Sequence, residues 1–379
     1  MKYLLEHANR HGYGVGAFDI VSLEFLAAAV GAAEACRAPV VLSVAEPHAD
    51  HVDPESLLPA VESRARRARV PVAIQFHHAR SVPSGIRAIA LGCGSVTLDG
   101  AHGALAERSA AARAMVEMAH ACGVPVEGGL NAILRDSEPE ADAVSVETAQ
   151  EFVAHTGIDF LAIADAPRSA ARRPRIDFKR LAQLRSSVSV PLTVDGNHRF
   201  SDEEYRHLIE SGVAKLGYYA GLSGVAARTL RQSAGATHQN GYLRLMRDLP
   251  EALHREVERC LRLSGSAGRA DAALAHCRPV RTVEHCIVYN VVEGAAEREV
   301  AGMMEKGREV LGRIPGVRGV FAGRAVQADG RYRYCWRIVF ANAAVIDRYR
   351  EHPDHVAFAD GRFRPLAPDR LSIDFEEIP

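Results

Sequence analysis

Between Val15 and Tyr219 the chain repeats one pattern of apolar and polar positions. A short run rich in β-branched residues ends on a polar or acidic residue, and a segment with apolar residues three and four positions apart follows it. This alternation is typical of β/α units around a parallel sheet. The expected strands cover residues 15–19, 39–44, 70–76, 95–99, 124–129, 160–165, 191–196 and 215–219. Eight such strands predict an α/β fold, a closed TIM (β/α)8 barrel.

The segments between these strands carry helix start and stop signals. Asp53-Pro54 supplies an N-cap followed by a first-turn proline, and Ser201–Glu204 predicts a capping box. Gly123, Gly157 and Gly212 stand where three of the helices should end.

A second pattern begins near Val280. Strands are expected over residues 282–292, 317–326, 332–340 and 370–378, with helices over 295–311 and 343–350. The order β-α-β-β-α-β is ferredoxin-like. A tract rich in small residues, 264–275, precedes this unit. We therefore predict a barrel over residues 1–273, a linker over 274–280 and a small α+β domain over 281–379.

Composition and charge limit the classes of function. The 379 residues include 46 basic and 47 acidic side chains, and no Lys/Arg-rich run is mixed with aromatic residues, which argues against nucleic-acid binding. The seven cysteines are scattered and lack metal-binding spacing, which favours a reduced setting. Neither a signal sequence nor a membrane-spanning stretch is evident. We expect a soluble cytoplasmic protein that acts on a small molecule.

In β/α barrels the reacting groups come from the carboxyl ends of the strands. Carboxylates and imidazoles gathered there can bind a divalent metal or divide acid and base roles. The expected strand ends of this chain carry Asp19, Glu46, His77, His78, Asp99, Glu127, Asp165, Asp195, His198, Tyr218 and Tyr219. Schiff-base chemistry is not expected, because it needs a lysine at this end and Lys215 should face the other one.

Six segments, in order, resemble the class II (metal-dependent) ketose-bisphosphate aldolases. The matching segments are GYGVGAFDIVSLE (12–24, similar to GYAVPAFNI), VPVAIQFHHA (70–79, VPVALHLDHG), SVTLDGAH (95–102, SVMIDGSH), GVPVEGGLN (123–131, GVSVEAELG), VPLTVDGNHR (190–199, VPLVLHGGSG) and LSGSAGRA (263–270, the closing helix). The resemblance implies a TIM barrel, a divalent metal and a homodimer or higher homo-oligomer.

The family's functional residues match this chain less well. An Asp-His pair supplies the family's general acid and one zinc ligand, and the equivalent positions are His77 and His78. The other two zinc histidines fall near Ser169 and on Asp195. The phosphate-holding Gly-Gly-Ser-Gly turn becomes 196–199, Gly-Asn-His-Arg, which removes the close approach of backbone N–H groups to a phosphate. Ordinary bisphosphate aldolase activity is therefore not expected.

Three interpretations of the barrel stay open: a re-purposed site, an inactive scaffold, and the family reaction with unusual ligands. In the first, a new catalytic set consists of His77, His78, Glu127, Asp195 and His198. His78, Asp195 and His198 could hold zinc or non-haem iron. The candidate substrate-binding residues of the barrel are Asp19, Asp99, Asp165 and Tyr218. Because adjacent strand residues point to opposite faces, His77 and His78 should not both face inward unless the strand has ended.

Residues 281–379 resemble the dimeric α/β-barrel (Dabb) stress-response family through VEHCIVYNV (283–291) and YREHPDHVAF (349–358). In a cyclase of that family the tyrosine and the second histidine of the later motif are catalytic, and these positions are Tyr349 and His355. A tyrosine could orient a carbonyl group while a histidine removes an α-proton; alternatively, the motif only shapes the corner of the chain. His285 is a candidate substrate-binding residue. The family implies sheet-to-sheet homodimers.

Together these patterns predict a carbon–carbon bond lyase of aldolase type, acting on a small oxygenated substrate in a specialised pathway without a nucleotide cofactor. One alternative is a non-haem-metal or cofactor-independent oxygenase or cyclase that uses the small domain. The other is a catalytically inactive aldolase-like scaffold.

Overall fold

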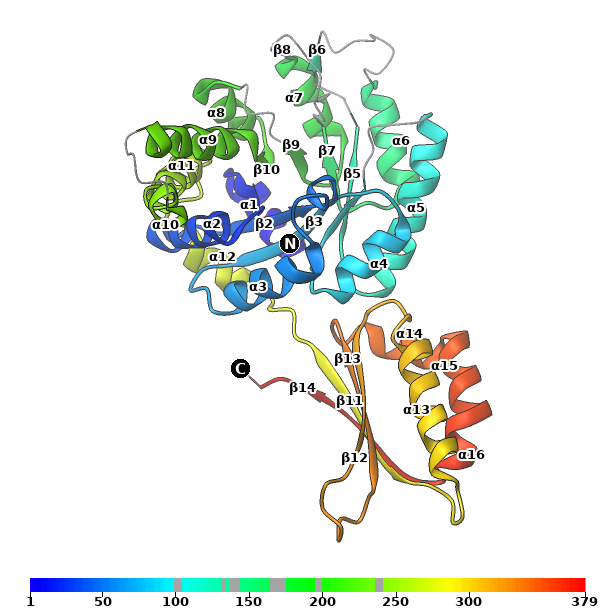
Figure 1. Ribbon diagram of the computed structural model, residues 1–379. Coiled ribbons are helices and arrows are strands. Elements are labelled where there is room, and N and C mark those ends of the chain that lie inside the picture. The colour runs from blue at the N-terminus through cyan, green and yellow to red at the C-terminus, as the bar shows by residue number, and fades with distance from the viewer. Residues whose placement is uncertain are drawn as a thin grey trace. The chain divides into compact units, whose positions relative to one another are not determined.

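The computed structural model of the protein describes residues 1–98, 104–130, 134–135, 144–163, 175–194, 200–235 and 241–378. The chain forms two compact units (Figure 1). The first comprises Met1–Gly85, Cys93–Val116 and Pro125–Arg278, and the second comprises Ile86–Gly92, Glu117–Val124 and Pro279–Pro379.

The first unit contains a closed parallel barrel, which confirms the predicted α/β class. Its strands are β1 (Val15–Asp19), β2 (Val40–Ala45), β3 (Val72–Ala79), β4 (Val96–Leu98), β5 (Val126–Gly129), β7 (Phe160–Ala162), β9 (Leu192–Val194) and β10 (Val213–Tyr218). They pair in the order β1-β10-β9-β7-β5-β4-β3-β2. The short strands β6 (Leu134–Arg135) and β8 (Arg175–Ile176) form a separate antiparallel pair.

The helices of this part of the chain are α1 (Lys2–His11), α2 (Leu23–Cys36), η1 (Glu46–His48), α3 (Pro54–Arg66), α4 (Val82–Ala90), α5 (Leu105–Ala121), α6 (Val146–Thr156), α7 (Phe178–Ser187), α8 (Asp202–Glu210), α9 (Ala220–Gly235), α10 (Tyr242–Leu245), α11 (Leu249–Leu263) and α12 (Ala270–His276). Within the residues described, no helix is long and apolar enough to cross a membrane.

The predicted helix signals are confirmed. Asp53 caps α3 by accepting hydrogen bonds from the backbone N–H groups of the first turn, and Pro54 begins the helix. Ser201 and Glu204 form the capping box of α8. Gly157, with φ of 73°, occupies the left-handed C-cap position of α6, where a side chain would be strained.

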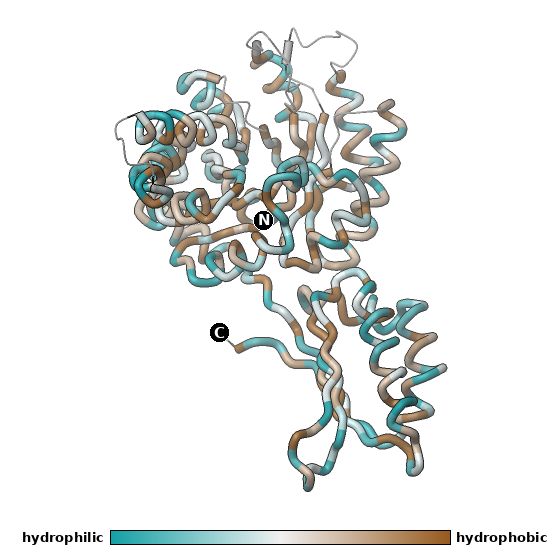
Figure 2. Tube along the Cα trace, viewed as in Figure 1, coloured by the Kyte–Doolittle hydropathy of each residue, from teal (hydrophilic) through white to brown (hydrophobic). Residues whose placement is uncertain are grey.

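An apolar plug closes the amino end of the barrel. Leu4 and Leu5 of α1 pack with Val15, Val41 and Phe160, which lie at or near the beginnings of their strands. Burying a leucine side chain stabilises a fold by about 1.5–3 kcal/mol, so two buried leucines fix α1 in place. Figure 2 shows apolar residues concentrated along the barrel strands. Because the amino end is closed by apolar side chains, we look for functional polar side chains at the carboxyl end of the barrel.

The tract of small residues differs from the prediction. Helix α12 covers its second half, and Ala270 and Ala273 are buried. Residues 274–276 of the expected linker are therefore helical, because alanines at helical spacing can pack against the barrel.

The second unit confirms the predicted ferredoxin-like order. Strands β11 (Val283–Asn290), β12 (Val317–Arg324), β13 (Tyr334–Phe340) and β14 (Asp369–Glu376) form an antiparallel sheet in the order β12-β13-β11-β14. The helices are α13 (Glu297–Leu311), α14 (Val345–Glu351), α15 (Pro353–Phe358), the π-helical turn η3 (Ala359–Phe363) and α16 (Arg364–Leu366). These helices lie on one side of the sheet (Figure 1).

Candidate active site

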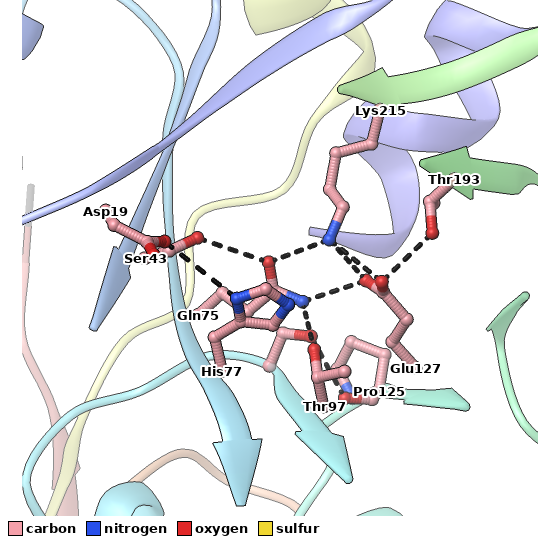
Figure 3. Close-up of polar contacts among 10 residues, drawn as sticks. Asp19, Ser43, Gln75, His77, Thr97, Pro125, Glu127, Thr193 and Lys215 are labelled. Atoms are coloured by element: carbon pink, nitrogen blue, oxygen red, sulfur yellow. Dashed lines mark hydrogen bonds and ion pairs between the residues drawn. The ribbon is translucent and has the colours of Figure 1, made fainter. Parts of the chain in front are cut away.

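Polar side chains from six barrel strands meet inside the barrel, and we call them the polar layer (Figure 3). All are between 0% and 2% exposed: Ser43, Gln75, Thr97, Glu127, Thr193 and Lys215. The Gln75 amide connects several of them, donating to Thr97 Oγ1 at 2.5 Å and to Glu127 Oε2 at 2.8 Å. Since buried polar groups are costly without partners, this connectivity allows a polar layer inside an apolar barrel.

An ion pair lies at the centre of the polar layer. Lys215 Nζ is 2.6 and 2.9 Å from the two Glu127 carboxylate oxygens, and it donates to Gln75 Oε1 at 3.1 Å. Thr193 Oγ1 donates to Glu127 at 2.9 Å. A buried pair of this kind needs such additional hydrogen bonds, because each charge has been taken out of water.

Two predictions about this pair are wrong. Glu127 does not stand at the end of its strand; it is the second residue of β5 and is fully buried. Lys215 was expected to face the amino end of the barrel, but β10 begins at Val213 and the lysine side chain reaches Glu127. Lys215 is the third residue of β10 and pairs in register with Thr193, so its side chain lies in the same polar layer as Glu127.

A second group of side chains lies at the carboxyl ends of β1, β2, β3 and β10, and we call it the mouth cluster. It consists of Asp19, His48, His77, His78 and Tyr219. Asp19 is central: its carboxylate lies 3.7 Å from His48 Nε2 and 3.8 Å from His77 Nδ1. Burial alone would raise the pKa of Asp19, but contacts with the two imidazoles lower this pKa to about 2. Asp19 is therefore ionised at neutral pH.

The two adjacent histidines lie together. The rings of His77 and His78 stack with their centroids 3.9 Å apart. His78 has a left-handed backbone, with φ of 55°, and the pairing of β3 with β4 shifts register between Phe76 and Ala79. The regular alternation expected of adjacent strand residues therefore does not hold at this point, because one left-handed residue interrupts it in a strand that continues to Ala79.

Sequence reasoning selected Tyr218 and missed His48. Tyr218 stacks on Phe18 and contacts Tyr205 of α8, so it packs toward the helices, not into the mouth as predicted. Tyr219, one residue beyond the strand, lies against the His48 ring, with centroids 4.4 Å apart. His48 could have been found as a polar residue in the first turn after β2.

Four predicted site residues, Asp99, Asp165, Asp195 and His198, lie outside the described residues, as does Ser169. Of the predicted metal ligands, only His78 belongs to the described part of the chain. No three His, Cys, Asp or Glu side chains of that part form a group that could hold a metal ion. The metal site therefore stays a prediction.

The second unit brings its three predicted residues together and adds two. His285 Nδ1 lies 2.6 Å from Asp374 Oδ1, and Asp374 Oδ2 accepts a hydrogen bond from Arg350 at 2.8 Å. The rings of Tyr349 and His355 are 4.4 Å apart, and those of His285 and Tyr349 are 6.1 Å apart. His355 Nδ1 lies 3.0 Å from the backbone oxygen of Arg350.

The protonation states in this group follow from burial. Burial raises the pKa of the Tyr349 hydroxyl and lowers the pKa of the His355 imidazole. At neutral pH the phenol is protonated and the imidazole neutral. The sequence carried one unused signal: Asp374 is an acidic residue within an expected strand of apolar character, and it pairs in register with His285.

Comparison with known protein families settles the relationship of the first unit. Residues 1–269 match the family model of class II fructose-bisphosphate aldolase. The chain belongs to the class II fructose-bisphosphate aldolase family. Residues 283–377 match the stress responsive A/B barrel domain, Dabb. Both resemblances drawn from the sequence are confirmed.

Solved structures agree with this assignment. The YdjI aldolase from Escherichia coli K12 is 26% identical, with a TM-score of 0.63 over 71% of this chain and 98% of its own. A putative fructose-1,6-bisphosphate aldolase from Coccidioides immitis is 26% identical, with a TM-score of 0.62 over 71% and 97%. A fructose-bisphosphate aldolase from Campylobacter jejuni shares the fold at 16% identity, with a TM-score of 0.60 over 69% and 93%.

The class II aldolase barrel of this chain therefore contains two polar levels. The polar layer holds Glu127 in an ion pair with Lys215. Above it on β3, two residues after Gln75, the mouth cluster begins with His77. His77 and His78, which the sequence resemblance predicts to stand at the positions of the family's acid and zinc ligand, both lie in the described part of the mouth.

Proposed function

We propose that the protein is a carbon–carbon bond lyase of aldolase type that acts on a small oxygenated substrate in a specialised biosynthetic pathway. The observation that carries this proposal is the mouth cluster, in which an ionised Asp19 contacts the imidazoles of His48 and His77. Imidazoles move protons at neutral pH, and a carboxylate holds such a ring in one orientation.

His77 is our candidate for proton transfer at the substrate oxygen. In aldol cleavage the β-hydroxyl group loses a proton, the Cα–Cβ bond breaks, and an aldehyde and an enolate result. His77 stands at the position equivalent to the family's general acid, is 7% exposed, and contacts Asp19. An imidazole there can take the hydroxyl proton in cleavage and return it in the reverse reaction.

A divalent metal, zinc or iron, is part of the proposal, with His78, Asp195 and His198 as its ligands. Two imidazoles and one carboxylate suit either metal, and the His78 imidazole belongs to the mouth cluster. A bound divalent ion supplies a Lewis acid for the substrate carbonyl. The new donor set and the altered phosphate turn together support a substrate other than a bisphosphate.

Metal analysis of the purified protein, followed by aldol-cleavage assays of the His78→Ala and Asp195→Ala variants, tests this proposal. We expect stoichiometric zinc and the loss of activity and metal in both variants, while the matched variant His51→Gln keeps both. Stoichiometric iron with oxygen uptake would favour an oxygenase. A metal-free protein whose activity survives both substitutions would contradict the barrel site.

The Dabb domain supports a second candidate function, an aldol-type cyclase or a cofactor-independent oxygenase. A neutral His355 can accept an α-proton while the Tyr349 hydroxyl donates a hydrogen bond to the carbonyl group. The ring of His285, held by Asp374, lies 6.1 Å from that of Tyr349. If Tyr349→Phe and His355→Ala leave turnover unchanged, this domain serves only dimerisation.

We further propose a homodimer, formed by the open face of the Dabb sheet. Leu371, Ile373 and Phe375 alternate along β14 and are 48%, 43% and 52% exposed. Phe321 of β12 is also 52% exposed, but Arg337 and Cys286 separate it from Ile373 in the same cross-strand row, so the apolar row is that of β14. An apolar row of this kind can be covered by the same row of a second copy. The seven cysteines, all free, support a cytoplasmic setting.

A further inference from the structure

We infer that His48 is a further catalytic residue of the barrel, the group that moves the proton at the α-carbon of a β-hydroxy carbonyl substrate. This inference rests on the proposed function, since it assigns the second of the two proton transfers that aldol chemistry needs. His77, at the substrate oxygen, would perform the first.

The segment that carries His48 is fixed at several points. The Glu46 side chain accepts a hydrogen bond from the backbone N–H of Arg80 at 2.8 Å, which ties η1 to the residue after β3. The His48 carbonyl accepts hydrogen bonds from the backbone N–H groups of His51 and Val52. These contacts hold His48 at the rim, and a catalytic side chain needs such a supported position.

The orientation of the His48 ring is also determined. Its Nε2 faces the Asp19 carboxylate at 3.7 Å, and one face lies against the Tyr219 ring. This distance is longer than a hydrogen bond, but the nearby ionised carboxylate favours the tautomer with hydrogen on Nε2, which leaves the lone pair on Nδ1. Within the described residues, no side chain hydrogen-bonds to Nδ1, and the His48 side chain is 23% exposed. Nδ1 is thus available to substrate.

The two imidazoles on Asp19 are suited to different tasks. The His77 side chain is 8% exposed and His48 is 23% exposed, so one ring lies deeper than the other. Aldol cleavage separates two reacting atoms, the hydroxyl oxygen and the α-carbon. The deeper His77 ring can then act on the hydroxyl oxygen and the more exposed His48 ring on the α-carbon, with Asp19 in contact with both.

The proposed steps balance in protons and electrons. In enolisation, His48 Nδ1 takes the α-proton, and the C–H electron pair forms the enolate. In cleavage, His77 takes the hydroxyl proton, the Cα–Cβ electron pair remains on the enolate, and protonated His48 returns a proton to the α-carbon. Exchange with water restores both rings, and no oxidant or reductant is needed.

Exchange of α-protons in D₂O separates the two roles. The probes are dihydroxyacetone and pyruvate, followed by NMR, beside aldol turnover with an added aldehyde. We expect His48→Gln to lower both exchange and turnover by about 10²-fold, as for loss of a general base. His77→Gln should lower turnover while exchange continues. His51→Gln, three residues along the same turn, is the matched control, and thermal melting checks that each variant folds.

The outcomes distinguish this inference from the proposed function. If His48→Gln exchanges α-protons at the wild-type rate, the assignment of His48 is wrong. The lyase proposal is then judged separately, by whether the wild-type protein shows aldol turnover. If the folded wild-type protein, loaded with zinc or iron, neither exchanges protons nor cleaves or forms aldols with these probes, both proposals fall. If His48→Asn behaves as His48→Gln does, loss of the ring nitrogen, not a change in side-chain size, is responsible.

Discussion

At the residue scale, Asp19 is the side chain that links two imidazoles of the mouth cluster, those of His48 and His77. It is an ionised carboxylate with only two imidazoles as close partners among the described residues. Its pKa, lowered to about 2, measures how strongly folding favours the charged form.

Asp19→Asn tests this environment through stability. The folded pKa is about 2, and that of an unfolded aspartate is about 4. The contribution of Asp19 is therefore fully present above pH ~4 and lost as the pH falls through the folded pKa. We expect the variant to lower the free energy of unfolding by about 2 kcal/mol at pH ~5 and by almost nothing at pH ~2.

Urea unfolding of both proteins across this pH range measures the difference. Asp50→Asn, at an exposed position nearby, is the matched control and should show no such pH dependence. A difference that stays constant from pH ~5 to pH ~2 would mean that the imidazole contacts do not stabilise the ionised carboxyl.

At the scale of elements, the ion pair of the polar layer links β5 to β10, and hydrogen bonds extend it to Gln75 of β3 and Thr193 of β9. Lys215→Met leaves the Glu127 carboxylate buried without a counter-charge, and we expect this to cost about 3–5 kcal/mol. Replacing both residues by methionine should restore most of the stability, because the pair is then replaced by apolar packing. Chemical denaturation of the two single variants and the double variant tests this. Single variants within about 1 kcal/mol of wild type would show that water reaches the layer.

The sequence of strands and helices along the chain and the helix caps were predictable, because each depends on local periodicity or on one capping residue. The site was predictable only where a strand is regular. His78 could not be placed, since a single left-handed residue resets the alternation of β3. Tyr218 was misplaced because Lys215 points into the barrel, and alternation along β10 then directs Tyr218 toward the helices. Lys215 was misplaced because β10 begins at Val213, so the lysine is not at the start of its strand.

At the scale of the whole molecule, the homodimer proposed above would form through the open face of the Dabb sheet. Ile373→Asp places a charge in the middle of the exposed apolar row. We expect this variant to be a monomer of unchanged helix and strand content, because the Ile373 side chain points away from the packed core, and we expect the wild type to be a dimer. Sedimentation velocity measures the mass, and circular dichroism confirms the fold. Glu377→Asp, a conservative change beyond the end of β14, is the control. A dimeric Ile373→Asp variant would exclude this face.

The ion pair of Lys215 and Glu127 has a consequence for any intermediate formed above it. A positive and a negative charge held 2.6 Å apart almost cancel when viewed from the mouth of the barrel. The polar layer below the mouth is thus close to electroneutral, and it neither attracts nor repels an enolate. The negative charge of the enolate must therefore be balanced by groups at the rim of the barrel. Substitutions at the rim are then the ones expected to change which substrate the barrel accepts.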